Sequence, residues 1–372
     1  MKRNILITLI AILTPSLAQA QLGADGYYRI INNATSRYIT ITDDIIGEVN
    51  TSNTSVDLSN ITTWRGFDYV KSSPASVLYV EKVGSQYNFA AQGTSIYTLS
   101  GGRIYIDLIQ NGEAYAFQVT YSGMTGRLYD SANSDDKGSV SNKKSVTENQ
   151  FWRFVPINDE NYIGLQPTVQ AADGWYGTIY ASFPFKTASS GITVYYVDGV
   201  HEGQFELKEI TDEIKPASTP LVFKCSSNDP AQNKITPVTG TTTAPTDNKL
   251  GGTYFASTIN EHEEYVKFDA NTMRVLGVDG SNNLIFTTAS QDYLTKKKYI
   301  PMNTCWLNVP TGLTGDFKLV SRDVYTGINS IEASSQKSAV KGTFTLSGVP
   351  VDDNKALRPG IYIKNGQKVV IK

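Results

Sequence analysis

The stretch GYYRIINNATSRYITITDD, residues 26–44, decides the fold class of this chain. Tyr28 and Ile30 alternate with polar neighbours, and residues 38–41 return after the turn-forming segment NNATS. Period-two alternation on both sides of a short polar turn predicts a β-hairpin. Similar hairpin-like segments follow it, namely FDYVKSSPASVLYVEK (67–82), YNFAAQGTSIYTLSGG (87–102) and YAFQVTYSGMTGRLYDSAN (115–133).

The composition of the whole chain favours the same class. Tyr occurs 22 times in 372 residues, and charged residues make up only 18%. Long helical periodicity is absent after residue 20, and short alternating runs recur between Gly, Asn, Asp and Ser clusters. The sequence therefore predicts an all-β protein that is long enough for two or three domains.

The first twenty residues, MKRNILITLIAILTPSLAQA, have the pattern of a secretory signal peptide. A basic start is followed by an apolar run and a small-residue A-x-A end, so we expect cleavage after Ala20. The run is too short, and too broken by Pro15, to span a membrane. We therefore expect a secreted or outer-surface protein that is exported through the periplasm and has no transmembrane segment in its mature form.

The expected mature chain is mildly acidic. Removing Lys2 and Arg3 leaves 31 Lys and Arg against 35 Asp and Glu, with no basic tract. This balance argues against nucleic acid and anionic membranes as partners.

The segment ENQFWRFVPI (148–157) closes the first region with the spacing Gln150-Phe151-Trp152. Together with IINNATSRYITI (30–41), it resembles the ricin-type β-trefoil lectins, which repeat a hairpin unit three times and end units with Q-x-W. The resemblance covers about a third of the chain and implies a β-trefoil domain at 24–158. It implies structural roles for Gln150 and Trp152, with the Trp152 ring packed in the shared core.

In lectins of this kind an Asp accepts hydrogen bonds from sugar hydroxyls, and an aromatic ring stacks on the sugar. The resemblance therefore implies ligand-binding roles in GRLYDS (126–131) and in the first unit. The candidates are Asp43, Asp44, Tyr129 and Asp130. The alternative for the Asp residues is an ordinary turn carboxylate that accepts from its own backbone.

A second region, residues 162–310, contains what we interpret as two copies of one unit. MRVLGVDGSNNLIFTTA (273–289) repeats the pattern of VYYVDGVHEGQFELKEI (194–210), and IPMNTCWLNVP (300–310) repeats that of KPASTPLVFKC (215–225). The repetition predicts two related halves facing each other in a β-sandwich. Residues 228–252, rich in Thr, Pro, Gly and Asn, are expected to form a surface loop between the halves.

The segments GTIYASF (177–183), ITVYYVDG (192–199) and IKPAST (214–219) resemble a β-sandwich module of Bacteroidetes surface proteins. That resemblance implies a structural or adhesive module and supplies no catalytic residues.

The last region has a polar, small-residue segment that we expect to be a linker, at 311–341, and then a β tail at 342–372. Asn365-Gly366 between IYI and KVVI predicts a tight hairpin. The tail resembles the type IX secretion signal of Bacteroidetes, which implies the secretion machinery as a partner. The alternative is a last hairpin that docks on the preceding domain.

No catalytic, cofactor or metal motif is present. His262 in INEHEEYVKF lacks the second His of a zinc site, and His201 lies in a turn segment. Cys225 and Cys305 permit one disulfide in an oxidising compartment. The sequence leaves open whether these two cysteines pair. The sequence thus favours a non-enzymatic exported binding protein whose partner is a glycan or a surface protein. Two alternatives are a structural matrix protein without a small ligand and a glycosidase with unrecognised paired carboxylates.

Overall fold

The structure is a computed structural model in which the chain forms two compact units, Met1–Ser321 and Arg322–Lys372. It describes residues 22, 24–41, 48–50, 55–57, 61–96, 98–99, 102–121, 123–132, 134–201, 203–255, 266–320, 343–345, 350–351, 359–364 and 367–371. The predicted signal peptide with Ala20, and also Asp43, Asp44 and His262, lie outside these ranges.

The described residues confirm the all-β class. Regular helix is limited there to four single-turn 3-10 segments, η1 (Phe67–Tyr69), η2 (Pro74–Ser76), η3 (Glu148–Gln150) and η4 (Pro230–Gln232). No helix of this part of the chain is long and apolar enough to cross a membrane.

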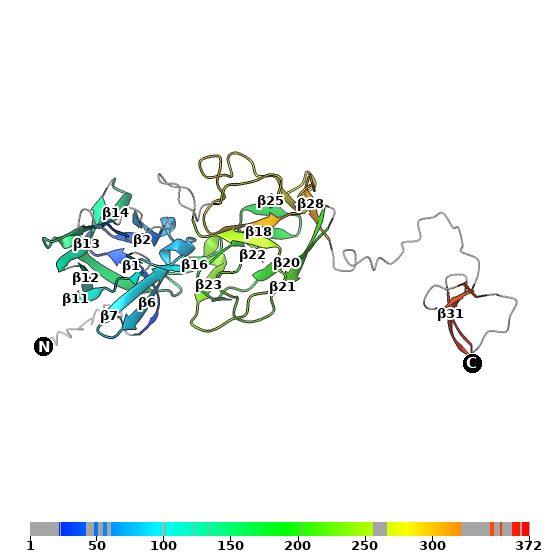
Figure 1. Ribbon diagram of the computed structural model, residues 1–372, viewed down its shortest axis with the longest axis horizontal. Helices are drawn as coiled ribbons and strands as arrows, with labels where there is room; N and C mark the ends of the chain where they lie inside the picture. The colour runs from blue at the N-terminus through cyan, green and yellow to red at the C-terminus, as the bar shows by residue number, and fades with distance from the viewer. Residues whose placement is uncertain are drawn as a thin grey trace, which may run out of the picture. The chain divides into compact units, whose positions relative to one another are not determined.

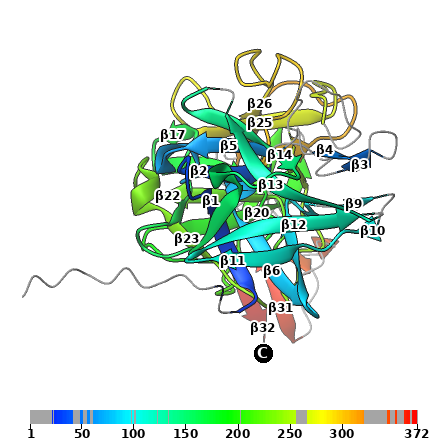
Figure 2. The same cartoon turned by 90° about the vertical axis from the view of Figure 1, so that its left-hand side faces the viewer.

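Six strands of the first region close into a barrel. They pair in the cyclic order β1–β6–β7–β11–β12–β15–β1, with the β7–β11 step made by the bridge between Tyr87 and Ile106. Figures 1 and 2 show the labelled barrel strands grouped together in blue to green. The strands are β1 (Gly26–Asn32), β6 (Leu78–Val83), β7 (Gln86–Ala91), β11 (Asp107–Asn111), β12 (Ala114–Tyr121) and β15 (Phe151–Pro156).

Further strands are inserted in three places along the chain, between β1 and β6, between β7 and β11, and between β12 and β15. A six-stranded barrel that carries one hairpin segment in each of three repeats has the strand arrangement of a β-trefoil. The additional strands are β2 (Arg37–Ile41), β3 (Glu48–Asn50), β4 (Ser55–Asp57), β5 (Ile61–Arg65), β8 (Thr94–Ser95), β9 (Thr98–Leu99), β10 (Gly102–Arg103), β13 (Met124–Ala132) and β14 (Lys137–Lys143).

Large aromatic side chains fill the trefoil core. Trp152 is fully buried, lies parallel to Phe117 with ring centroids 5.9 Å apart, and donates its indole N–H to the carbonyl oxygen of Leu128 at 3.1 Å. Phe89 and Phe154 belong to the same cluster. Their burial anchors the barrel strands β7, β12 and β15 to one another.

The second region consists of two four-stranded halves with identical pairing. In the first half, β18 (Gly174–Ile179) pairs with β22 (Leu221–Cys225), which pairs with β20 (Thr193–His201), which pairs with β21 (Gln204–Glu209). The second half repeats this order with β24 (Leu250–Thr253), β27 (Thr304–Asn308), β25 (Met273–Val278) and β26 (Leu284–Thr287).

One strand joins the two halves into a continuous curled sheet. β28 (Phe317–Leu319) pairs with β21 on one side and β26 on the other. Inward-facing residues of both halves, such as Val222 and Leu307, share one core. Further strands lie outside the repeats, namely β17 (Val169–Ala171) and the small sheet of β16 (Ile163–Gly164), β23 (Lys234–Pro237) and β19 (Phe185–Thr187).

Two sequence expectations about this region are corrected. Residues 228–252 are not only a loop, because they contain η4, β23 and the first strand of the second half, β24. The linker expected from residue 311 cannot begin there, since Phe317–Leu319 is paired in the sheet and Phe317 is fully buried.

The unit Arg322–Lys372 contains a four-stranded sheet with the order β30–β29–β31–β32. The hairpin predicted at its end is present, with Gly360 opposite Ile371 and Lys364 opposite Gln367. The strands are β29 (Thr343–Thr345), β30 (Pro350–Val351), β31 (Gly360–Lys364) and β32 (Gln367–Ile371).

Candidate functional site

Asp130, a sequence candidate for sugar binding, is a buried structural carboxylate. Its side chain has no exposed surface. It accepts hydrogen bonds from the hydroxyls of Thr35 and Thr63 and from the guanidinium of Arg37, which lies 3.1 Å away. These three donors belong to the first trefoil repeat, whereas Asp130 lies on β13 of the third. The carboxylate therefore ties two repeats together, which corrects both its expected ligand role and the alternative of a local turn carboxylate.

Tyr129 does not share a site with Asp130. Neighbours in a strand point to opposite faces of a sheet, and Tyr129 lies under the ammonium group of Lys143, which is 4.7 Å from its ring centroid. The ring is half-buried on this outer face. The two residues that were expected to cooperate are thus separated by the sheet.

Gln150 and Trp152 both lie inside the domain. The Gln150 side chain accepts from the backbone N–H of Thr147 at 2.8 Å and completes a capping box at η3. It also donates to the carbonyl oxygen of Lys143. The Q-x-W segment thus has structural contacts at both of its outer residues.

The cysteines form no disulfide. Cys225 and Cys305 are both free and buried, on β22 and β27 of the two different halves. The Cys305 thiol points to the carbonyl oxygen of Ile179, 3.2 Å away. Burial raises the pKa of both thiols to about 12, so neither is a ready nucleophile at neutral pH.

An exposed aromatic surface on the trefoil is the strongest candidate site. Tyr69 is 50% exposed and stacks on Trp64, with ring centroids 4.9 Å apart and an interplanar angle of 21°. The Tyr69 hydroxyl is 3.4 Å from a carboxylate oxygen of Asp136, and the Lys137 ammonium is 5.2 Å from the Trp64 ring centroid. We call these four residues the Tyr69 surface.

The fold brings these four residues together from separate segments. Trp64 lies on β5, Tyr69 ends η1, and Asp136 and Lys137 stand where the chain enters β14. The backbone N–H of Arg65 donates to the carbonyl oxygen of Asp136 at 2.7 Å, which fixes this turn against β5. The surface therefore offers an aromatic face, a solvated carboxylate and a cation within a few ångströms of one another.

Sequence reasoning missed this surface because it placed Phe67–Tyr69 in a strand. The structure instead forms η1, which turns Tyr69 back over Trp64. The signal available in the sequence was the pair of aromatic residues five apart around Gly66, whose φ of +93° permits the turn.

Comparisons with known proteins add little to this picture. No known protein family matches the chain, and no curated protein does. Among solved structures, the chain is similar to a designed threefold symmetric protein, ThreeFoil, with 15% sequence identity and a TM-score of 0.25. The match covers 36% of this chain and 100% of that chain. The trefoil description above rests on the strand pairings alone.

No group of three or more His, Cys, Asp or Glu side chains that could hold a metal ion is found among the described residues.

Proposed function

We propose that this chain is an exported, non-enzymatic protein that binds carbohydrate through the Tyr69 surface of its β-trefoil. The observation that carries the proposal is the geometry of Tyr69. Its ring is braced by Trp64, remains 50% exposed, and has the Asp136 carboxylate beside its hydroxyl.

The chemistry of a sugar ring complements this arrangement. A pyranose has a face of C–H groups and an edge of hydroxyls. The C–H face is attracted to the electron-rich face of an aromatic ring. The Asp136 carboxylate can accept hydrogen bonds from hydroxyls, and the Lys137 ammonium can donate to them.

The rigidity of the surface supports binding. Trp64 pairs with β14 at Lys137 and with β2 at Tyr38, so its position is set by two neighbouring strands. The ring of Tyr69 stacks on Trp64 and is therefore held in place before a ligand binds. Binding then immobilises little further side-chain motion, so its entropy cost is small.

The surroundings of the carboxylates support a role without catalysis. A glycosidase uses two carboxyl groups that flank the scissile bond, one of them with its pKa raised by an apolar setting. Asp68, Asp135 and Asp136, the carboxylates carried by η1 and the β13–β14 turn, are all exposed to water. They lack the shielding on which such an acid depends.

The two ends of the chain support export. Residues 1–20 have the signal-peptide pattern, and the terminal sheet pairs Ile361 with Val370, side chains that are 39% and 58% exposed. Lys364 and Lys368 lie on the same hairpin. We propose that secretion machinery of the type IX kind recognises this sheet and that the mature protein is secreted or held at the outer surface.

A glycan array probed with the mature full-length chain tests the binding proposal. We expect binding to a related group of glycans that is lost in Tyr69→Ala and kept in Tyr129→Ala, because Tyr129 pairs with Ser141, four residues along β14 from Lys137, and its ring lies against Lys143 instead. A blank array would support a structural matrix role. Hydrolysis of aryl glycosides by the wild-type chain would support the glycosidase alternative.

A further inference from the structure

The second half of the curled-sheet region carries an insertion that the first half lacks. Its two repeated segments are separated by ten residues, 290–299, whereas those of the first half are separated by four, 211–214. Both halves nevertheless pair their strands in the same order. The shared strand order thus does not depend on the inserted segment, SQDYLTKKKY, which contains three lysines in a row.

The first two of these lysines form the centre of a strained β-turn. Lys296 and Lys297 have φ of +49° and +57°, and the backbone N–H of Lys298 donates to the carbonyl oxygen of Thr295 at 3.1 Å. Nowhere else in the described part of the chain do two adjacent non-glycine residues both have positive φ. A turn with positive φ at both central residues favours Asn-Gly or Asp-Gly, because a longer side chain is disfavoured in this conformation. The strain therefore indicates a purpose for the two lysines other than folding.

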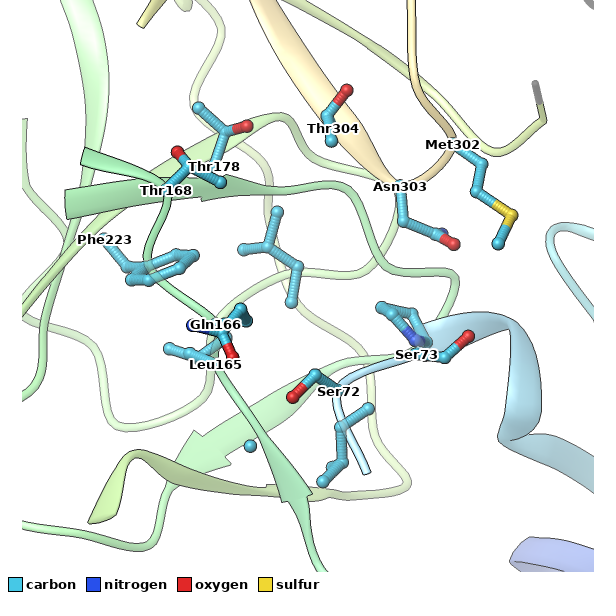
Figure 3. Close-up of a pocket in the computed structure, with 14 residues that line it drawn as sticks. Ser72, Ser73, Leu165, Gln166, Thr168, Thr178, Phe223, Met302, Asn303 and Thr304 are labelled. Carbon is cyan, nitrogen blue, oxygen red and sulfur yellow. The ribbon is translucent and has the colours of Figure 1, made fainter. Parts of the chain in front are cut away.

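The surrounding structure holds the turn in this form. Thr295 and Tyr299 exchange backbone hydrogen bonds of 2.9 and 3.0 Å. Leu294 and Ile300, on either side of the turn, are buried in one apolar cluster. The chain then reaches Asn303, which Figure 3 shows beside a cavity of about 240 Å³ and whose side chain is hydrogen-bonded to the trefoil. The turn is thus fixed on both sides.

The turn presents several ammonium groups to solvent. Lys296 and Lys297 are exposed, and neither takes part in an ion pair among the described residues. Lys267 is also exposed and lies opposite Tyr299 in a β-bridge, so a third lysine joins from a neighbouring segment. The Lys298 ammonium lies 5.1 Å from the Tyr299 ring centroid.

The described acids closest in sequence do not pair with these lysines. The Asp269 carboxylate, two residues after Lys267, accepts hydrogen bonds from the backbone N–H of Asn271 and the hydroxyl of Thr272. Asp292 is exposed and forms no ion pair with a described residue. The turn therefore concentrates positive charge on a chain whose expected mature form has 31 Lys and Arg against 35 Asp and Glu.

This charge distribution decides which partner fits. A lysine ammonium donates up to three hydrogen bonds and favours carboxylate or sulfate oxygens. A flat anionic membrane would bring its charge against the rest of a net acidic chain and be repelled. A flexible polymer with anionic groups can instead contact the turn alone.

We propose that the Lys296–Lys297 turn binds an acidic polysaccharide, whose carboxylate or sulfate groups pair with Lys267, Lys296 and Lys297. The proposal is independent of the Tyr69 surface and holds whether or not that surface binds glycans.

Biolayer interferometry with the full-length mature chain tests the proposal on three polymers, namely dextran sulfate, alginate and uncharged dextran. We expect saturable binding of dextran sulfate and alginate that weakens as the salt concentration rises, and no binding of dextran. Absence of binding to both acidic polymers, or equal binding of dextran, would overturn the proposal. Binding of phosphatidylserine vesicles but of neither acidic polymer would also overturn it, in favour of a membrane contact.

A double variant separates the charge from the backbone. Lys296→Asn with Lys297→Gly supplies the residues that this turn favours, so we expect a higher urea midpoint together with a loss of polymer affinity of about five- to thirtyfold. The matched control is Lys143→Asn with Lys144→Gly, which removes the same charge from two adjacent exposed lysines that lack positive φ. The control should keep its affinity and show no rise in the midpoint. Full affinity in the Lys296, Lys297 variant, or an equal loss in both variants, would contradict the proposal.

Discussion

Gln92 of the β-trefoil and Asn303 of the curled-sheet region face each other with paired side-chain amides. Gln92 Nε2 donates to Asn303 Oδ1 at 3.0 Å, and Asn303 Nδ2 donates to Gln92 Oε1 at 2.9 Å. Both side chains are buried, and both backbones have positive φ. The junction between the two domains is therefore a specific polar contact as well as an apolar one.

Gln92→Ala should destabilise this junction. The variant removes both hydrogen bonds between Gln92 and the Asn303 amide and the one to the Tyr254 carbonyl oxygen, whereas Asn303 Nδ2 keeps its bond to the Tyr180 carbonyl oxygen. We expect a cost of about 1–3 kcal/mol in the free energy of unfolding. Urea unfolding followed by fluorescence measures it, with Gln110→Ala as the control because Gln110 lies exposed on β11. Equal stability of both variants would show that the amide pair contributes nothing.

Asp130→Ala should cost more because Arg37 is then buried without its carboxylate partner. Removing one member of a buried ion pair typically costs about 3–5 kcal/mol. We expect a large fall in the free energy of unfolding and no specific effect on glycan binding by the fraction that remains folded. A variant with wild-type stability that has lost binding would return Asp130 to the role of a sugar ligand.

The thiols should be protected in the folded chain. Because burial raises the pKa of Cys225 and Cys305 from 9.0 to about 12, a thiol reagent at pH 8 should react slowly before unfolding and with two groups per chain in urea. Rapid labelling of the native chain, or a mass that changes by two hydrogens on reduction, would contradict the structure.

The same pKa shifts predict a loss of stability in alkali. The folded state favours the protonated thiol because burial raises the pKa of the thiol. The resulting contribution to the free energy of unfolding is complete below pH 9.0 and is lost as the pH rises towards about 12. Tyr27, whose pKa is raised by burial to about 12, acts in the same direction. Urea midpoints measured from pH 7 to pH 11 should fall above pH 9, and the Cys225→Ala, Cys305→Ala double variant should reduce that slope.

Equivalent glycines in the two halves should respond alike. An added Cβ would lie 2.4 Å from the Phe223 ring at Gly177 and 2.3 Å from the Trp306 ring at Gly251. We expect Gly177→Ala and Gly251→Ala each to lower the free energy of unfolding by about 1–3 kcal/mol through overpacking. Gly280→Ala, where no atom lies within 4 Å, is the matched control.

Local pattern was enough to predict the all-β class and the final hairpin. Period-two alternation is a property of each strand, and Asn365-Gly366 is a strong local turn signal. The duplication was also visible, since the sequence Val-Asp-Gly recurs at 197–199 and 278–280, although the first copy lies inside β20 at a β-bulge and is not a turn. Features that depend on neighbours close in sequence were therefore accessible.

Features that depend on distant pairing were not accessible. β24 has two glycines and lies in a Thr- and Pro-rich segment, so its strand character comes from β27 rather than from its own residues. Likewise, Asp130 has the local sequence of a turn carboxylate, and only the barrel brings Thr35, Arg37 and Thr63 to it.

The Tyr69 surface was missed for the same reason. Asp68 directly precedes Tyr69 in the sequence, but the acid beside the Tyr69 hydroxyl is Asp136, which follows Tyr69 by 67 residues. The pairing of β5 with β14 brings the two segments together. Apart from the aromatic pair around Gly66, a surface formed by strand pairing between repeats leaves no contiguous motif in the sequence.

The most direct test of the account is the affinity of the best glycan from the array, measured by calorimetry for the wild type, Tyr69→Phe, Tyr69→Ala and Asp136→Asn. The account predicts that Tyr69→Phe keeps most of the affinity because the ring still stacks on Trp64, that Asp136→Asn weakens binding several-fold, and that Tyr69→Ala abolishes it. Full affinity in Tyr69→Ala and Asp136→Asn would show that this surface does not bind the glycan.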